Sequence, residues 1–203
     1  MSTLDPAGPM AASVARLWWV MLIGAGLIAG LVLVCLLVAF RRKRPGRGSV
    51  GFWIMGLGVA FPTGTLTALL VYALVTGERL LPHPGQPGVL RVEGTARQWA
   101  WRFSWPDGGP AMADGGPLVI PVGRPVDFHV TSEDVIHSLW IPRLGGKIDA
   151  LPGHVNVIRL MASEPGRFGA QCAEFCGDGH AGMFFWVDAL PDEEFAALAG
   201  RDR

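Results

Sequence analysis

The first third of the chain is dominated by two long runs of apolar residues. Neither residues 17–40 nor residues 51–75 contain a charged side chain. A helix of about 20 apolar residues crosses the roughly 30 Å hydrocarbon core of a bilayer, and Pro62 is tolerated in a membrane helix. The pattern therefore predicts a transmembrane helical hairpin over residues 17–77, with a loop at residues 41–50.

The flanks of these runs predict their orientation. Trp18 and Trp19 fit an interfacial aromatic belt. The loop between the runs is crowded with cations: Arg41, Arg42, Lys43, Arg44 and Arg47. By the positive-inside rule this loop stays in the cytoplasm and both chain ends lie outside. Residues 1–16 begin without a positively charged stretch, so we expect an extracytoplasmic segment rather than a cleaved leader.

Beyond a linker rich in proline and glycine at residues 78–88, the pattern changes to a period of two. Aromatic side chains alternate with small or polar ones in residues 98–105, which places the aromatic ones on one face of a strand. These aromatic residues are Trp99, Trp101, Phe103 and Trp105. Further short strands are expected at residues 118–122, 126–132, 135–141, 154–161, 168–172 and 184–188.

Short strands at this spacing, separated by turns of glycine and proline, indicate an all-β sandwich or barrel. We expect this domain to cover residues 89–190. After Pro191, three acidic residues suit the N-terminus of a helix, so the tail at residues 191–203 is expected to form a short helix.

Composition supports the membrane segments and adds an asymmetry of charge. Half of the residues are apolar and 17% are charged. The formal net charge is zero, but residues 1–77 hold six basic residues and one acid, which leaves 11 basic and 16 acidic residues in the remainder. A mildly acidic domain suits a basic partner, although an ordinary solvated surface explains it nearly as well, and no nucleic acid partner is expected.

Soft metal-binding side chains are concentrated in one stretch, Cys172-Ala-Glu-Phe-Cys-Gly-Asp-Gly-His-Ala-Gly-Met183. Thiols, imidazole and thioether are ligands that select copper, and the glycines let the loop fold back on itself. A one-copper site of the blue type needs one Cys and two His. The second Cys therefore favours two coppers, with one more His from elsewhere in the fold. The remaining cysteine, Cys35, lies in an apolar run and is expected to be an inert packing residue.

Two other readings of Cys172 and Cys176 stay open on their spacing alone. Outside the cytoplasm a pair of cysteines commonly forms a disulfide. The pair could also be a redox-active dithiol, although thioredoxin-like copper chaperones usually carry Pro after the second Cys, where this chain has Gly177. The ordered set of Cys, Glu, Cys, His and Met favours copper.

This loop resembles the binuclear copper (CuA) loop of subunit II of cytochrome c oxidase. A second stretch is similar to that family's other signature: Ser132-Glu-Asp-Val-Ile-His-Ser-Leu-Trp-Ile-Pro-Arg-Leu-Gly-Gly-Lys-Ile-Asp-Ala-Leu-Pro-Gly153. It supplies the missing imidazole, His137. The resemblance runs over nearly the whole chain, from the first membrane helix to the copper loop. It implies a two-helix transmembrane hairpin followed by an all-β cupredoxin-like sandwich.

The resemblance implies a role for each donor. Two cysteines would bridge two coppers, each metal would carry one histidine, and a thioether and a backbone carbonyl would be further ligands. The donors are Cys172, Cys176, His137, His180, Met183 and the carbonyl of Glu174. Thiolates that share one electron in a rigid loop make a relay with no open position for substrate. The Glu174 carboxylate would also help to bind a Mg or Mn ion shared with subunit I, since one carboxylate alone is a poor site.

The resemblance also implies which residues face cytochrome c, the electron donor. Gln98-Trp-Ala-Trp101 matches the family's aromatic stretch, which makes Trp99 the residue through which electrons arrive from cytochrome c. Without the resemblance, a Trp on an aromatic strand face is more often core. Ala100 stands where the family usually has an aromatic residue. Acidic residues that could face lysines of cytochrome c, although each alone is more often a solvated charge, are Asp114, Glu133, Asp134 and Asp178.

The function that the resemblance implies is electron input to a haem-copper terminal oxidase. The chain would accept electrons from cytochrome c and pass them to the haem of subunit I, where oxygen is reduced to water and protons are translocated. We expect subunit I and subunit III as partners, with haem in the partner only. The expected location is the cell inner (plasma) membrane, with the copper domain on the periplasmic side.

Two departures and two alternatives accompany this expectation. Val50-Gly-Phe-Trp53 stands where the family often has Glu-x-x-Trp near a proton path, and the segment between the aromatic strand and Leu118 is short. The same copper centre serves some nitric oxide reductases. A membrane-anchored copper-delivery or thiol-redox protein is the other alternative, which the number of donors disfavours because a carrier must release its metal. A quinol oxidase subunit II would lack the cysteines.

Overall fold

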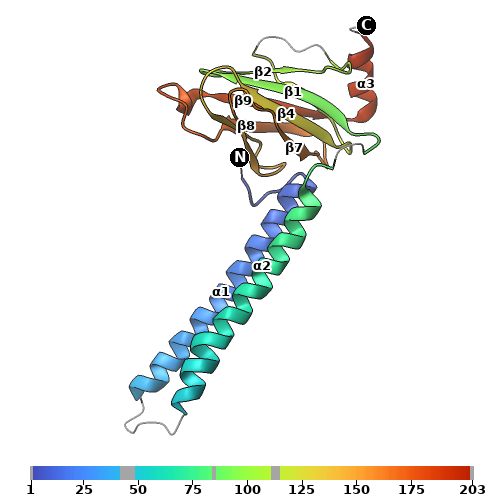
Figure 1. Ribbon diagram of the computed structural model, residues 1–203. Helices are drawn as coiled ribbons and strands as arrows, with labels where there is room; N and C mark the ends of the chain where they lie inside the picture. The colour runs from blue at the N-terminus through green and yellow to red at the C-terminus, as the bar shows by residue number, and fades with distance from the viewer. Residues whose placement is uncertain (1, 42–48, 84–85, 111–114, 202–203) are drawn as a thin grey trace. The chain divides into compact units, whose positions relative to one another are not determined.

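The computed structural model describes residues 2–41, 49–83, 86–110 and 115–201. It divides into two compact units (Figure 1). One unit, the helical unit, is Arg16–Leu80. The other unit combines the N-terminal residues up to Ala15 with Leu81–Arg203, and we call it the β domain.

The helical unit is built from long apolar helices. Helix α1 spans Pro9–Arg41, and the second helix runs from Phe52 to Leu80 as a π-helical stretch η1 (Phe52–Ala60) followed by α2 (Phe61–Leu80). Both helices are long and apolar enough to cross a membrane, and their apolar side chains are exposed. At 1.5 Å per residue, the 33 residues of α1 reach roughly 50 Å.

Helix α1 begins earlier than the sequence pattern predicts, at Pro9 instead of residue 17. Proline is favoured in the first turn of a helix because it needs no N–H donor there. The second helix ends at Leu80 instead of residue 75. The basic loop expected at residues 41–50 lies mostly outside the described residues, apart from Arg41 and the last two positions.

Two sheets form the β domain. The four-stranded sheet has the order β2-β1-β4-β7, and the five-stranded sheet has the order β3-β9-β8-β5-β6. The pairs β1/β4 and β3/β9 are parallel and the other pairs are antiparallel. The strands are β1 (Leu90–Arg97), β2 (Ala100–Ser104), β3 (Leu118–Pro121), β4 (Val126–Ser132), β5 (His137–Trp140), β6 (Lys147–Ala150), β7 (Asn156–Leu160), β8 (Gly166–Cys172) and β9 (Phe184–Leu190). Helix α3 (Asp192–Arg201) follows β9.

The core of the β domain lies where both sheets turn their apolar positions inward. Strand β4 alternates between buried and half-buried residues, as expected for a strand with one buried face. Phe128 from β4 and Phe168 from β8 are almost completely buried. Beside them an aromatic cluster joins the two sheets, because Trp101 and Phe103 of β2 contact Phe185 of β9 at ring separations of 5.8 and 5.1 Å.

The predicted fold class, two long apolar helices followed by an all-β sandwich, is confirmed. One prediction within it is wrong, because Trp99 does not share the inward face of Trp101 and Phe103. Strand β2 begins only at Ala100, and Trp99 lies in the turn before it with 44% of its surface exposed. Strand β6 was not predicted: its four residues alternate between polar and apolar types, but so short a stretch gives a weak signal.

The N-terminal segment is an integral part of the β domain. The Ala7 N–H donates to the carbonyl of Arg143 at 2.8 Å, and the Ser163 N–H donates to the carbonyl of Ala7 at 2.7 Å. The Arg143 guanidinium in turn reaches Asp5 at 3.0 Å. At Gly8 a Cβ would lie 2.4 Å from the carbonyl oxygen of Met161, so only glycine fits this close approach.

Candidate metal centre

Three neighbouring elements bring the soft donors to one end of the sandwich. Strand β5 begins with His137, and its neighbour β8 ends with Cys172. The two strands are antiparallel, with Leu139 opposite Cys172, so the start of one lies near the end of the other. The loop at residues 173–183 then folds back before β9 begins at Phe184.

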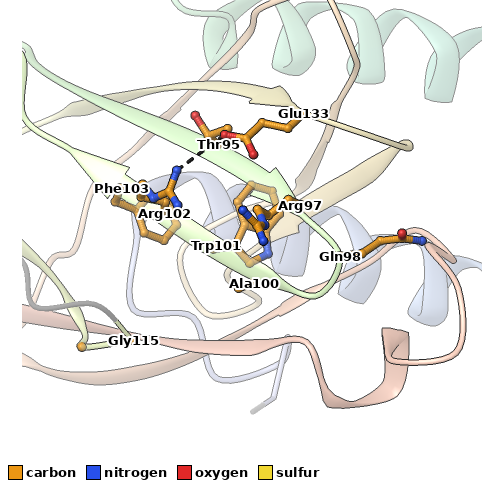
Figure 2. A pocket seen from close by; sticks show the side chains of 10 residues that line it. Thr95, Arg97, Gln98, Ala100, Trp101, Arg102, Phe103, Gly115 and Glu133 are labelled. Carbon is orange, nitrogen blue, oxygen red and sulfur yellow. Dashed lines mark ion pairs between the residues drawn. The ribbon is translucent and has the colours of Figure 1, made fainter.

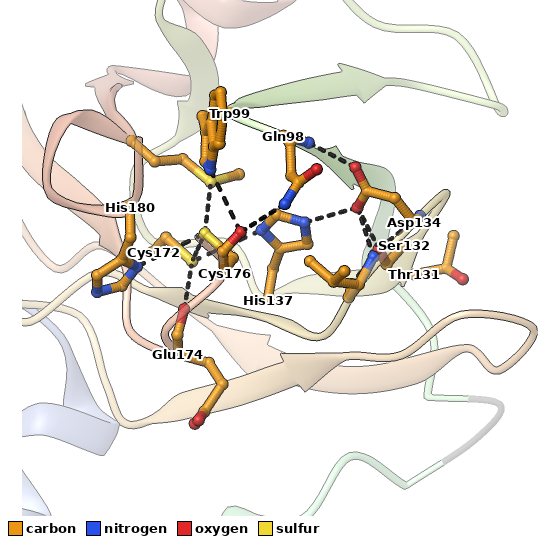
Figure 3. Close-up of polar contacts among 12 residues, drawn as sticks. Gln98, Trp99, Thr131, Ser132, Asp134, His137, Cys172, Glu174, Cys176 and His180 are labelled. Carbon is orange, nitrogen blue, oxygen red and sulfur yellow. Dashed lines mark hydrogen bonds and ion pairs between the residues drawn. The ribbon is translucent and has the colours of Figure 1, made fainter. Parts of the chain in front are cut away.

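The donor atoms of β5 and of this loop lie around two sulfur atoms (Figure 3). The Sγ atoms of Cys172 and Cys176 lie 3.9 Å apart. Cys172 Sγ lies 3.8 Å from His137 Nδ1 and 3.3 Å from the carbonyl oxygen of Glu174. Cys176 Sγ lies 3.6 Å from His180 Nδ1 and 3.9 Å from the sulfur of Met183. All six donors expected from the sequence are therefore brought together.

Backbone hydrogen bonds hold the loop closed. The Cys172 N–H donates to the carbonyl of Met183 at 3.0 Å, so the two ends of the loop are joined directly. A single 3₁₀ turn (His180–Gly182) brings the imidazole and the thioether to the same side. Gly177 has a φ of 116°, a conformation that side-chain-bearing residues rarely adopt. The loop is thus shaped by its glycines and fixed at both ends.

Most of the donors are buried, and both thiols are unbonded to each other. His137 is fully buried, and Cys172, Cys176 and Met183 are 4%, 3% and 1% exposed. Burial raises the pKa of Cys176 to about 11, with a further contribution from the neighbouring Cys172. A buried cluster of two thiols, imidazole nitrogens and a thioether fits soft metals such as copper and offers little to oxygen-seeking ions. The residues present therefore fit the binuclear copper site.

A carboxylate orients the buried histidine. Asp134 Oδ1 lies 2.8 Å from His137 Nε2, which leaves Nδ1 to face Cys172. Burial acts to raise the pKa of Asp134, but the N–H of Gln98, the His137 ring and the N–H of Val135 outweigh it, so the pKa lies well below its usual range. Such carboxylate–histidine pairs fix the ring orientation of metal-binding histidines and make them stronger ligands.

A short aromatic turn lies against the same loop. The Gln98 Nε2 donates to the carbonyl of Cys176 at 2.7 Å, and the Trp99 indole N–H reaches the same oxygen at 3.3 Å. The ring of Trp99 also covers Gly179, where a Cβ would lie only 2.3 Å from the indole. Trp99 is therefore both exposed to solvent and in contact with the backbone of a sulfur donor.

The predicted acidic docking residues have different surroundings. Asp134 is occupied by His137 and by two backbone N–H groups. Glu133 lies 3.5 Å from the guanidinium of Arg102 on β2 (Figure 2). Asp178 is exposed in the loop beside Trp99, and Asp114 lies outside the described residues.

The backbone carbonyl and the side-chain carboxylate of Glu174 face different partners. Its carbonyl faces Cys172, while its carboxylate points away from the cysteines and lies 3.4 Å from Lys147 Nζ (Figure 3). A Mg or Mn ion at this carboxylate would have to take the place of the lysine contact and find its other oxygen ligands on another chain.

Sequence reasoning named Gln98 and Asp134 but missed the contacts that they make within the site. Nothing in the pattern singled out Gln98, whose amide holds the Cys176 carbonyl, because its partner is far away in sequence. The contact of Asp134 with His137 could have been found, since a carboxylate three residues before a metal-binding histidine is within reach of its ring.

The known proteins that this chain resembles are second subunits of respiratory oxidases. The periplasmic domain of cytochrome c oxidase subunit II matches residues 110–190. Cytochrome c oxidase subunit 2 of Alkalihalophilus pseudofirmus is 33% identical over 97% of this chain and 60% of its own length. Ubiquinol oxidase subunit 2 of Acetobacter aceti is 41% identical over 53% of this chain and 34% of its own length.

A solved structure extends the similarity to three dimensions. The periplasmic domain of subunit II of cytochrome oxidase from Bradyrhizobium japonicum has a TM-score of 0.50 and 33% identity, over 55% of this chain and 91% of that chain. The chain spans 33% to 60% of the length of the curated relatives that head the comparison.

Proposed function

Because the chain belongs to the cytochrome c oxidase subunit II family, we propose that it is the electron-input subunit of a haem-copper terminal oxidase. In this role it accepts electrons from a c-type cytochrome and passes them to the haem of subunit I. There oxygen is reduced to water, with coupled proton translocation. Subunit I and subunit III are its proposed partners.

The observation that carries the proposal is the convergence of four further donors on two thiols that are not bonded to each other. The residues that would hold the metals are His137, Cys172, Cys176, His180 and Met183, together with the carbonyl of Glu174. Two coppers held by these residues would supply a one-electron carrier. The protein would hold these donors in a fixed geometry and exclude water from them. The burial of both cysteines and His137 supports this role.

Trp99 is the proposed residue through which electrons enter. Its ring is exposed, and its indole N–H reaches the carbonyl of Cys176. An electron-donating protein that touches this ring would therefore be separated from a sulfur ligand by Trp99 alone. Asp134 is proposed to act as a positioning residue, since it holds both His137 and the N–H of Gln98, the residue before Trp99.

Two other functions fit these residues less well. A copper carrier must present its metal for transfer, whereas four of the donors here are less than 5% exposed and the loop that carries most of them is closed at both ends. A quinol oxidase subunit would not need the cysteines.

The proposed location follows from the two candidate membrane helices and the similarity of the β domain to periplasmic domains. We place the chain in the cell inner (plasma) membrane, crossing it twice, with the β domain on the periplasmic side. The proposed Mg or Mn ion at Glu174 would need further ligands from subunit I, since the Glu174 carboxylate is a single ligand and lies next to Lys147.

The test is the metal content and electron uptake of the full-length chain in detergent. It should take up two coppers per chain and give a spectrum in which one unpaired electron is shared by both metals. Cys176→Ser should abolish that spectrum because a hydroxyl is a poor bridging ligand. Cys35→Ser is the matched control, since Cys35 lies in α1 among exposed apolar side chains. A wild-type chain that binds a single copper would refute the proposal.

A further inference from the structure

The residue before Trp99 contacts both segments that carry the proposed copper ligands (Figure 3). The side-chain Nε2 of Gln98 donates to the backbone carbonyl of Cys176 at 2.7 Å. Its backbone N–H donates to one oxygen of the Asp134 carboxylate at 2.7 Å, and the other oxygen lies 2.8 Å from Nε2 of His137. Gln98 therefore links the loop at residues 173–183 to the histidine at the start of β5.

The carbonyl of Cys176 accepts two hydrogen bonds from the same turn. Gln98 supplies the shorter one, at 2.7 Å, and the indole N–H of Trp99 supplies the other, at 3.3 Å. An N–H···O bond in proteins is commonly about 2.7–3.2 Å long, so the amide contact is at the strong end of the range and the indole contact is beyond the weak end. The amide of Gln98 is thus the main anchor between the turn and the loop.

Two glycines of the loop leave room for these side chains. A Cβ at Gly177 would lie 3.0 Å from Nε2 of Gln98, and a Cβ at Gly179 would lie 2.3 Å from the indole of Trp99. Both Gln98 and Trp99 are exposed, so their contacts with the loop are not a by-product of core packing. Their position suits residues that connect a protein bound at the surface to the buried donors.

We infer that Gln98 is a positioning residue for electron delivery: its amide fixes the carbonyl of Cys176 and keeps the ring of Trp99 against the loop. This inference rests on the proposed function, since it concerns the path between the same donor and the same centre. Without the amide, the carbonyl would keep only the weaker indole bond, and the turn would be free to move away from the loop.

The same hydrogen bond should influence the potential of the centre. Hydrogen bonds around a cysteine ligand tune the potential of copper sites. An N–H directed at the carbonyl of Cys176 draws electron density away from this residue, which favours the reduced centre. Loss of the Gln98 amide should therefore lower the midpoint potential.

The test is Gln98→Met in the full-length, copper-loaded chain in detergent. Methionine has nearly the same length but no side-chain N–H, and the backbone N–H that bonds to Asp134 is retained. The variant should still bind two coppers per chain, with a lower midpoint potential than the wild type. Stopped-flow reduction by soluble cytochrome c should be about tenfold slower, in the range found when residues that support metal ligands are changed. The loss should persist at saturating cytochrome c, because the charge of the docking surface is unchanged.

Gln171→Met is the matched control. Gln171 precedes Cys172, but it lies on the outer face of β8, and among the described residues its side chain forms no hydrogen bond with the copper donors. This variant should keep the potential and the rate of the wild type.

A double variant tests whether Gln98 acts through Trp99. Gln98→Met combined with Trp99→Phe should be about as slow as the slower of the two single variants, because both changes loosen the same contact. Rate losses that simply add would show two independent effects and would overturn the inference.

Three other results would also overturn it. Gln98→Met could match Gln171→Met in potential and rate, which would leave Gln98 without a role. A rise only in the cytochrome c concentration needed for half-maximal rate would make Gln98 a docking contact, and loss of copper would make it a structural residue. A wild-type chain that cytochrome c does not reduce would instead refute the proposed function itself.

Discussion

The carboxylate of Asp134 lies 2.8 Å from Nε2 of the fully buried His137, and its second oxygen accepts the N–H of Gln98 at 2.7 Å. One side chain therefore connects a proposed copper ligand to the turn that carries Trp99. The proton on Nε2 is held by the carboxylate, so Nδ1 is left with a lone pair directed toward Cys172.

Asp134→Asn should lower copper affinity about tenfold to hundredfold, as changes of such supporting residues commonly do. The amide keeps one oxygen for His137, but its NH₂ group cannot accept the N–H of Gln98. Affinity is measured by competition with a chelator at neutral pH. Glu133→Gln is the control, because among the described residues its carboxylate forms an ion pair with the exposed Arg102 and has no contact with His137. Equal affinities in the two variants would contradict the positioning role.

Trp99→Phe should slow electron delivery from cytochrome c by at least ~tenfold, or about 1.4 kcal/mol in the barrier. The benzyl ring lacks the N–H that reaches the Cys176 carbonyl. Stability should change little, since Trp99 lies at the surface with 44% of it exposed and outside the core. Stopped-flow rates are compared with Trp186→Phe, another exposed indole, in β9. A normal rate in Trp99→Phe would remove this residue from the electron path.

Gly179→Ala should displace Trp99, because the added Cβ would lie 2.3 Å from the indole ring. We expect a slower electron delivery than in the wild type while copper remains bound, since the donors themselves are unchanged. Gly182→Ala is a matched control in the same loop, where a Cβ meets nothing within 4 Å. Similar rates for both alanine variants would show that the contact with Gly179 is unimportant.

Copper affinity should rise with pH. Burial and Cys172 raise the pKa of Cys176 to about 11, so at neutral pH this thiol carries a proton that metal must displace. One displaced proton gives about a tenfold gain in affinity per pH unit, and proton release can be measured in weakly buffered solution. The stability of the copper-free protein should change in the opposite direction and fall as the pH rises. The stabilisation is present below the pKa of an unfolded cysteine, near 9, and is lost as pH rises through about 11. An affinity independent of pH would contradict this prediction.

Protease added to intact spheroplasts should cut the chain within the β domain, beyond about residue 80, and leave the membrane helices. The reason is the run of cations that follows α1 in the sequence, which favours a cytoplasmic loop. The fragments can be identified by mass spectrometry, with a cytoplasmic protein as the control for cell integrity. Protection of the β domain in intact spheroplasts would reverse the proposed orientation.

The sequence predicts the sandwich and the donors because both follow local rules. Strand β4 was predicted with its observed bounds, since alternation of apolar and polar residues directly encodes a one-sided strand. The donors of the copper loop are close in sequence, so short loops suffice to bring them together.

What the sequence could not predict depends on contacts between distant segments. Trp99 continues the alternation of β2, and only the bond between the Gln98 side chain and the Cys176 carbonyl reveals a turn at that position. The bond that Asp134 accepts from the N–H of Gln98 is equally invisible, because the two residues are 36 positions apart in the chain.

The attachment of the N-terminal segment has a consequence for the order of folding. Asp5 and Arg143 are 138 residues apart in the chain, so their contact closes one of the longest loops that this sequence can form. Long-range contacts of this kind form late, since loop-closure entropy is lost before they contribute. During synthesis at about 5–20 residues per second, the 138 residues between Asp5 and Arg143 take roughly 7 to 28 s, and the segment has no binding edge until then. Until then Ala7 and Met10 have no surface to pack against. A fragment that starts after the second helix would lack this segment and would leave Leu144 and Gly145 exposed.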